Sequence, residues 1–178
     1  THSAMRMLYK YPQRAYPYSQ LIAENSRRGR EDDEFELLDT GIFDGDRYFD
    51  IVIEYAKASA DDLLIRIRAI NRGREAAELH LLPTLWFRNE WSWGDWHHLA
   101  GDGVPPPRPI LQRVQVQADA TYLRVVAEHH HLGRHILSGE EAEALLFTEN
   151  ETNFARLYGS ANPQPYVKDA FHARLVDG

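Results

Sequence analysis

The sequence has no cysteine among its 178 residues. This absence excludes disulfide bonds, thiolate nucleophiles and cysteine-ligated metals, and it agrees with a reducing compartment, so we expect a cytoplasmic protein. No apolar run approaches the roughly 20 residues that a membrane-spanning helix needs, and no signal-peptide pattern opens the chain. A membrane is therefore not an expected partner.

Basic residues are also fewer than acidic ones: the sequence has 20 Lys and Arg and 27 Asp and Glu, and its formal net charge is −7. Phosphate binding needs a basic face, so nucleic acid is not an expected partner. A chain of this length suits a single domain with its own core, which we expect over residues 1–178. The sequence opens on THSAMRM and stops at LVDG directly after an amphipathic stretch. We therefore expect a domain excised from a longer polypeptide.

Alternating apolar and polar residues predict antiparallel β-structure over most of the chain. In residues 47–58, Asp50 and Glu54 face away from the apolar set Phe49, Ile51, Ile53 and Tyr55. A turn near residues 60–62 leads into the next alternating run. Further short segments bounded by turn residues bring the total to roughly eight or nine strands, and the segments are 62–73, 77–87, 110–117, 121–129, 134–139, 143–150 and 153–159.

Helices are expected only as short flanking elements. Residues 17–29 begin with Pro17, whose fixed φ suits a first helical position, and Gly29 can end that helix. Residues 165–178 predict a second helix, and residues 35–41 an extended segment. The sequence thus predicts an all-β fold, an antiparallel β-sandwich with short flanking helices.

All four tryptophans fall within one short stretch, LWFRNEWSWGDWHH, which begins at Leu85. Indole rings stack on the apolar faces of sugars, and guanidinium and amide groups bind hydroxyls. Trp91 and Trp93 would share a face of an extended backbone, and Trp96 follows a Gly-Asp turn. Clustered rings also pack under loops or against neighbouring domains. Both interpretations, a sugar site and an internal or interdomain contact, stay open.

Metal and catalytic motifs are not recognisable. The run of three histidines at 129–131 lacks a carboxylate at ligand spacing, because the next acid is Glu140, and adjacent residues of a strand point to opposite faces. Residues 44–50 resemble a calcium loop but place Tyr48 where a ligand oxygen belongs and Phe49 where the loop needs glycine. No nucleophile elbow, phosphate loop or metalloprotease helix is present. We expect no metal, no cofactor and no catalytic residue in this chain.

Three long motifs carry a family resemblance: KYPQRAYPYSQLIAEN, FELLDTGIFDGDRYFDIVIEYAKAS and LHLLPTLWFRNEWSWG. They resemble bacterial glucosidases related to processing α-glucosidase I, in glycoside hydrolase family 63. The resemblance implies an N-terminal β-sandwich of the supersandwich, galactose-mutarotase-like type, joined to an (α/α)6 barrel that carries the inverting acid and base. No segment here resembles that barrel, so the catalytic barrel is expected to be absent and the chain alone inactive.

The resemblance also implies a role for the tryptophan-rich stretch. In such enzymes the sandwich packs on the barrel, and a loop reaches the mouth of the active-site pocket. At Glu90 this sequence departs from the small hydroxyl residue of the family motif. The expected substrate-binding or barrel-interface residues are Arg88, Asn89, Trp91, Trp93 and Trp96.

Two functions follow for this chain. The first is a non-catalytic N-terminal domain of an α-glucosidase, with the barrel of the same parent chain as partner and an α-glucoside oligosaccharide in the pocket. The second is an independent carbohydrate-binding module that uses residues 91–96. A third hypothesis, a small metal enzyme, requires bound metal.

Overall fold

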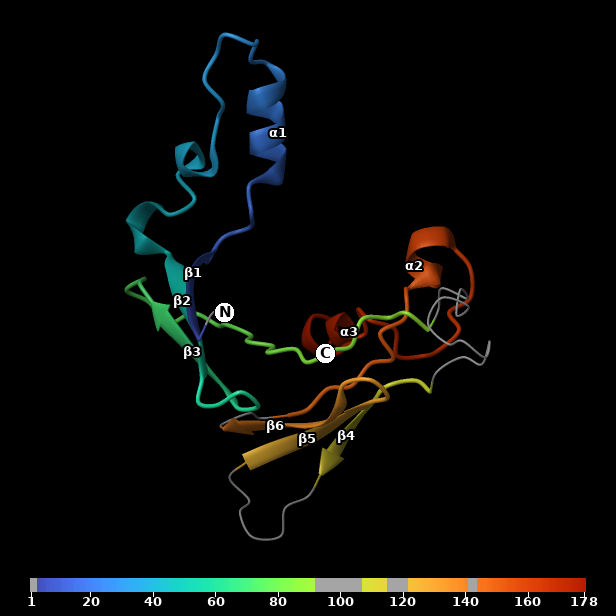
Figure 1. Ribbon diagram of the computed structural model, residues 1–178. Coiled ribbons are helices and arrows are strands. Elements are labelled where there is room, and N and C mark those ends of the chain that lie inside the picture. The colour runs from blue at the N-terminus through green and yellow to red at the C-terminus, as the bar shows by residue number, and fades with distance from the viewer. Residues whose placement is uncertain (1–2, 92–106, 115–121, 141–143) are drawn as a thin grey trace. The chain divides into compact units, whose positions relative to one another are not determined.

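The computed structural model of the protein describes residues 3–91, 107–114, 122–140 and 144–178. The chain divides into two compact units, Thr1–Leu82 and Pro83–Gly178. Each unit contains one three-stranded antiparallel sheet (Figure 1).

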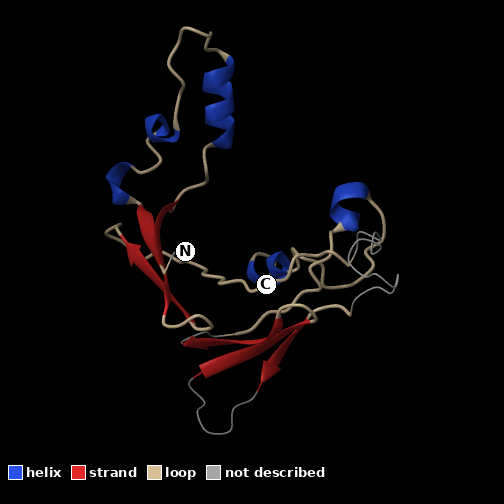
Figure 2. Ribbon diagram, in the orientation of Figure 1, coloured by secondary structure: helices blue, strands red, loops and turns tan. Residues whose placement is uncertain are grey.

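The sheet of the first unit has the order β1-β2-β3, with β1 (Ala4–Pro12), β2 (Tyr48–Lys57) and β3 (Leu63–Asn71). The central strand pairs with β1 from Ala4↔Ala56 to Pro12↔Tyr48, and with β3 from Phe49↔Asn71 to Lys57↔Leu63. A short turn joins β2 to β3. β2 pairs with a neighbour on each side, and Figure 2 shows the strands in red.

The two faces of this sheet differ in polarity because cross-strand partners share a face. The face that holds Phe49 and Ile51 of the central strand is apolar, and both of these side chains are buried. On the outer strands the same face carries large apolar side chains that stay exposed: Met5, Met7, Tyr9, Tyr11, Leu63 and Ile65. This apolar face thus leaves six large side chains exposed on β1 and β3.

The opposite face is held together by ion pairs between neighbouring strands. Asp50, which is only 6% exposed, accepts a hydrogen bond from Lys10 Nζ of β1 at 2.8 Å and another from Arg72 Nε just after β3 at 2.7 Å. The hydrogen bond from Lys10 and, more weakly, that from Arg72 lower the pKa of Asp50, although burial opposes them. Four residues further along β2, Glu54 accepts a hydrogen bond from Arg66 Nε at 2.8 Å. The charged residues of β2 therefore connect it to both neighbours.

Short helices lie between β1 and β2. They are α1 (Tyr18–Ser26) and the 3₁₀ turns η1 (Leu37–Thr40) and η2 (Asp44–Asp46). Asn25 at the end of α1 donates from Nδ2 to the carbonyl of Phe35 at 2.9 Å and accepts from the Phe35 N–H at 2.8 Å. This pair of bonds closes the loop that follows α1.

The sheet of the second unit has the order β4-β5-β6, with β4 (Ile110–Val114), β5 (Tyr122–His129) and β6 (Gly133–Glu140). Three successive residues of the central strand, Val125, Val126 and Ala127, are buried, so both faces of β5 are covered. Two one-turn helices follow, α2 (Phe154–Tyr158) and α3 (Phe171–Leu175). In the parts of the chain that the structure describes, no helix is long and apolar enough to span a bilayer.

The predicted β-rich class is confirmed, as two three-stranded antiparallel sheets with short helices. The strands predicted at 47–58, 62–73, 121–129 and 134–139 correspond to β2, β3, β5 and β6, and the helix predicted at 17–29 contains α1. The sandwich arrangement and the single domain over residues 1–178 stay predictions.

Several predicted elements are wrong. Residues 77–87 form no strand: Pro83 has no N–H to donate to a ladder, and none of the described strands pairs with the segment. The described residues 144–150 are also without a strand. Residues 153–159 form α2 instead of a strand, and residues 35–41 contain the 3₁₀ turn η1 instead of an extended segment. The strand β1 was not expected at all.

Candidate functional site

The candidate site lies in the second unit, where the start of the tryptophan-rich stretch meets residues 150 and 151. Residues 83–90 have no regular secondary structure. Side-chain hydrogen bonds, and not a strand ladder, therefore hold residues 83–90 in place. The contacts join residues about 60 positions apart in the chain.

Two asparagines form a reciprocal pair across this junction. Asn89 Nδ2 donates to the carbonyl of Asn150 at 2.8 Å, and Asn150 Nδ2 donates to the carbonyl of Phe87 at 2.8 Å. Asn150 has a positive φ of 54°, a left-handed conformation that asparagine adopts more readily than most residues. The pair fixes the backbone of both segments at the same point.

Glu151 is the centre of the site. It is only 7% exposed, and its carboxylate accepts from Trp91 Nε1 at 2.8 Å through Oε1 and from Asn89 Nδ2 at 3.3 Å through Oε2. The guanidinium of Arg108 lies 3.8 Å from Oε1 and supplies positive charge. A buried carboxylate is tolerated where its oxygens are paired in this way. The backbone carbonyl of Glu151 also accepts from the Lys168 N–H at 2.9 Å, which anchors the residue itself.

Arg88 and Glu90 project on the more exposed side of the same segment. Arg88 Nε lies 3.8 Å from Glu90 Oε1, and the side chains are 70% and 39% exposed. The Glu90 N–H donates to the Arg88 carbonyl at 3.0 Å, which tightens the backbone between Asn89 and Trp91. The carboxylate of Glu90 is thus an ion partner for Arg88.

Phe87 and three histidines lie beside this junction. The Phe87 ring is 5.1 Å from that of His129, which is stacked 4.5 Å from His130. His129 Nδ1 accepts from the backbone N–H groups of His131 at 3.1 Å and Leu132 at 3.3 Å, so it stabilises the turn between β5 and β6. Burial and the neighbouring imidazoles lower the pKa of His130, against a weaker opposing effect of Glu90. Within the described ranges, no group of three or more His, Asp or Glu side chains could hold a metal ion.

The predicted site residues thus divide into two groups. Arg88, Asn89 and Trp91 are described, and the last two converge on Glu151. Trp93 and Trp96 lie outside the described residues, so no contact of theirs bears on the prediction. Glu151 and Asn150 could not be predicted as site residues from the sequence, because neither has a local signal that links it to residue 89 or 91.

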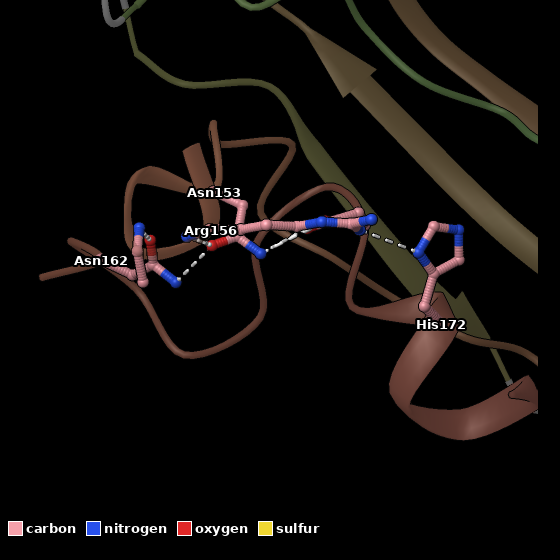
Figure 3. Close-up of polar contacts among 6 residues, drawn as sticks. Asn153, Arg156, Asn162 and His172 are labelled. Carbon is pink, nitrogen blue, oxygen red and sulfur yellow. Dashed lines mark hydrogen bonds and ion pairs between the residues drawn. The ribbon is translucent and has the colours of Figure 1, made fainter. Parts of the chain in front are cut away.

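A second polar cluster surrounds the start of α2 (Figure 3). Asn153 caps the helix by accepting from the Arg156 N–H at 3.0 Å, and its amide donates to Asp169 Oδ1 at 3.0 Å. Arg156 Nη1 lies 3.2 Å from Asp169 Oδ2 and 3.4 Å from His172 Nδ1, and Asn162 donates to Asn153. Donation from Asn153 and then from Arg156 lowers the pKa of Asp169, against an opposing effect of burial. Every polar contact in this cluster serves α2 or α3, so we assign it a structural role.

Comparison with known proteins gives one informative match. The chain is similar to the uncharacterized protein YMR196W of Saccharomyces cerevisiae, with 35% identity over 207 residues. The match covers 100% of this chain and 18% of the yeast protein, at its N-terminal end. The chain thus corresponds to the N-terminal part of a larger protein. No protein-family model matches the chain, and no solved structure matches it.

Proposed function

We propose that this chain is the non-catalytic N-terminal β-sandwich domain of a multidomain α-glucosidase. Its function is to pack on the catalytic helical barrel and to form one wall of the substrate pocket. The observation that carries the proposal is the match of the whole chain to the N-terminal 18% of a much longer protein. The α-glucosidase activity proposed for the parent protein rests on the resemblance of three long motifs to family 63 glucosidases.

The apolar face of the β1-β2-β3 sheet supports the structural part of this proposal. A face with six exposed Met, Tyr, Leu and Ile side chains is of the kind that sandwich and interdomain contacts bury. The charged face of the same sheet already pairs its acids and bases internally. We propose that the apolar face is the one that is covered in the complete enzyme.

The contacts at Glu151 refine the expected roles of the site residues. Both amide hydrogens of Asn89 are engaged, one by Asn150 and one by Glu151, so Asn89 holds the segment in place. Trp91 uses its indole N–H on Glu151, which leaves the faces of the ring for an apolar partner. We therefore propose ring stacking on a glucose unit at Trp91, with Arg88 as the source of directional donors.

An independent carbohydrate-binding module is the second candidate. One observation favours it: Asn89 and Trp91 bind Asn150 and Glu151, which belong to the same second unit. Residues 89–91 are therefore held in place without another polypeptide. Titration of the 178-residue chain with glucose oligosaccharides, followed by tryptophan fluorescence, separates the candidates. Saturable binding that Trp91→Ala abolishes identifies a module, and absence of binding identifies an accessory domain.

The decisive experiment compares the 178-residue chain with the full-length parent protein on α-glucosides. We expect turnover by the parent and none by the chain. In the parent, Trp91→Ala should raise KM because it removes the stacking surface. Trp86→Ala is the matched control, since this exposed tryptophan of the same segment has no bond to Glu151. A parent that hydrolyses no α-glucoside, or an isolated chain that does, contradicts the proposal.

A further inference from the structure

One buried carboxylate controls two residues of the candidate wall at once. Glu151 places Oε1 on Trp91 and Oε2 on Asn89, and these are the residues on either side of Glu90. A carboxylate can do this because, when ionised, both of its oxygens only accept. The guanidinium of Arg108 lies 3.8 Å from Oε1, the same oxygen that accepts from the Trp91 indole.

The alternatives for these donors are limited. If the Asn89 amide were flipped, its oxygen would face the Asn150 carbonyl that now accepts from Nδ2 at 2.8 Å. The indole of Trp91 has a single donor, and Glu151 accepts from it at 2.8 Å. A neutral side chain of the same shape at 151 would offer one oxygen and one NH₂, so at least one of the two donors would face another donor.

We propose that Glu151 is a positioning residue for Trp91: it fixes the orientation of the indole, so that the ring presents a face to one glucose unit of an α-glucoside. This inference rests on the proposed function for the identity of the sugar, and on the contacts of Glu151 alone for the orientation of the ring. Glu151 itself is only 7% exposed, and in this proposal it does not contact substrate.

The orientation is tested first, without any sugar, by NMR of the tryptophan indole N–H groups in the 178-residue chain. Trp91→Phe identifies the Trp91 signal by its disappearance. In the wild type, the Trp91 indole hydrogen should exchange with solvent at least tenfold more slowly than that of Trp86, which is 62% exposed. Equal exchange at the two positions would overturn the proposal without the need for any variant at 151.

The variant Glu151→Gln then tests the carboxylate. We expect the Trp91 indole signal to shift and its exchange to accelerate, with the other three indole signals in place. Glu149→Gln makes the same chemical change at an exposed position two residues away and should leave all four signals unchanged. An unshifted Trp91 signal in folded Glu151→Gln would refute the role of Glu151.

The link to the sugar is tested in the full-length parent by a double-mutant cycle. Glu151→Gln should raise KM about tenfold, the order expected for one hydrogen bond to a charged group, with little change in kcat. In a Trp91→Phe background the same change should leave KM almost unaltered, because phenylalanine has no N–H to orient. Additive effects of the two changes would overturn the positioning role even if the parent is an active glucosidase, whereas an inactive parent refutes only the proposed function.

Discussion

Asp50 connects all three strands of the first sheet, so its removal should loosen the sheet as a whole. In Asp50→Asn the side chain keeps its shape but loses its charge and one of two acceptor oxygens. The present partners are Lys10 Nζ at 2.8 Å and Arg72 Nε at 2.7 Å. We therefore expect β1, β2 and β3 to open more often in this variant, because both outer strands lose a bond to the centre.

The magnitude follows from burial. A hydrogen bond to a charged group contributes roughly 1.5–3 kcal/mol, and the carboxylate itself is 8% exposed. Lys10 and Arg72, however, are 40% and 48% exposed, so water screens both bonds and solvates the freed cations. Since asparagine retains one acceptor, we expect a net loss of about 2 kcal/mol for the two bonds together. This corresponds to about 30-fold faster opening of the sheet at neutral pH.

The pH dependence has a defined sign. The pKa of Asp50 lies below its ordinary value of 3.8, chiefly because of the hydrogen bond from Lys10. Its stabilising effect is therefore complete above that value and is lost as the pH falls through the lowered pKa. The pKa of Lys10 is raised above 10.5 by the same bond, so its contribution is lost only as the pH rises through the raised value. Asp50→Asn should remove both the acid and the alkaline dependence.

Hydrogen exchange of backbone amides in β1, β2 and β3, followed by mass spectrometry, measures the effect locally. Glu54→Gln is the matched control on the same face, and it should accelerate exchange less because Glu54 is more exposed, at 24%. Wild-type exchange rates in Asp50→Asn, or a difference from wild type that is the same near pH 2 as at pH 7, would refute this account.

Further predictions concern turns and caps. Asn153→Ala should destabilise α2 by about 1 kcal/mol, because it removes the N-cap as well as the bond to Asp169, and urea denaturation followed by circular dichroism would reveal it. Gly41→Ala should destabilise the chain more than Gly133→Ala in the same measurement. Both glycines have a positive φ, but an added Cβ at Gly41 would lie 2.7 Å from Asp44 Oδ2, whereas at Gly133 nothing lies within 4 Å. Equal losses for the two glycine variants would contradict the steric argument.

The β2-β3 hairpin could be predicted from the sequence because its signals are local. Alternation over residues 47–58 and 62–73 and a turn between them are enough to specify pairing and faces. The strand β1 has the same signal only in part, because Met5, Met7 and Tyr9 alternate with Arg6 and with the apolar Leu8. This interrupted alternation makes β1 harder to predict from the sequence.

Segment 153–159 shows where local patterns mislead. Its length and bounding residues predict a strand, but the segment forms α2. Phe154, Leu157 and Tyr158 are spaced as on one face of a helix, and Asn153 and Gly159 are its first and last caps. Glu151 is a different case, since its partner Trp91 is 60 residues away. No spacing rule connects them, so only the folded chain identifies the carboxylate.

The separation of Trp91 from Glu151 has a consequence for the order of folding. During translation the tryptophan-rich stretch leaves the ribosome well before its carboxylate has been synthesised. Closing a loop of 60 residues also opposes the contact by about 3–4 kcal/mol of chain entropy. The indole of Trp91 can therefore meet Glu151 only after most of the second unit has been synthesised.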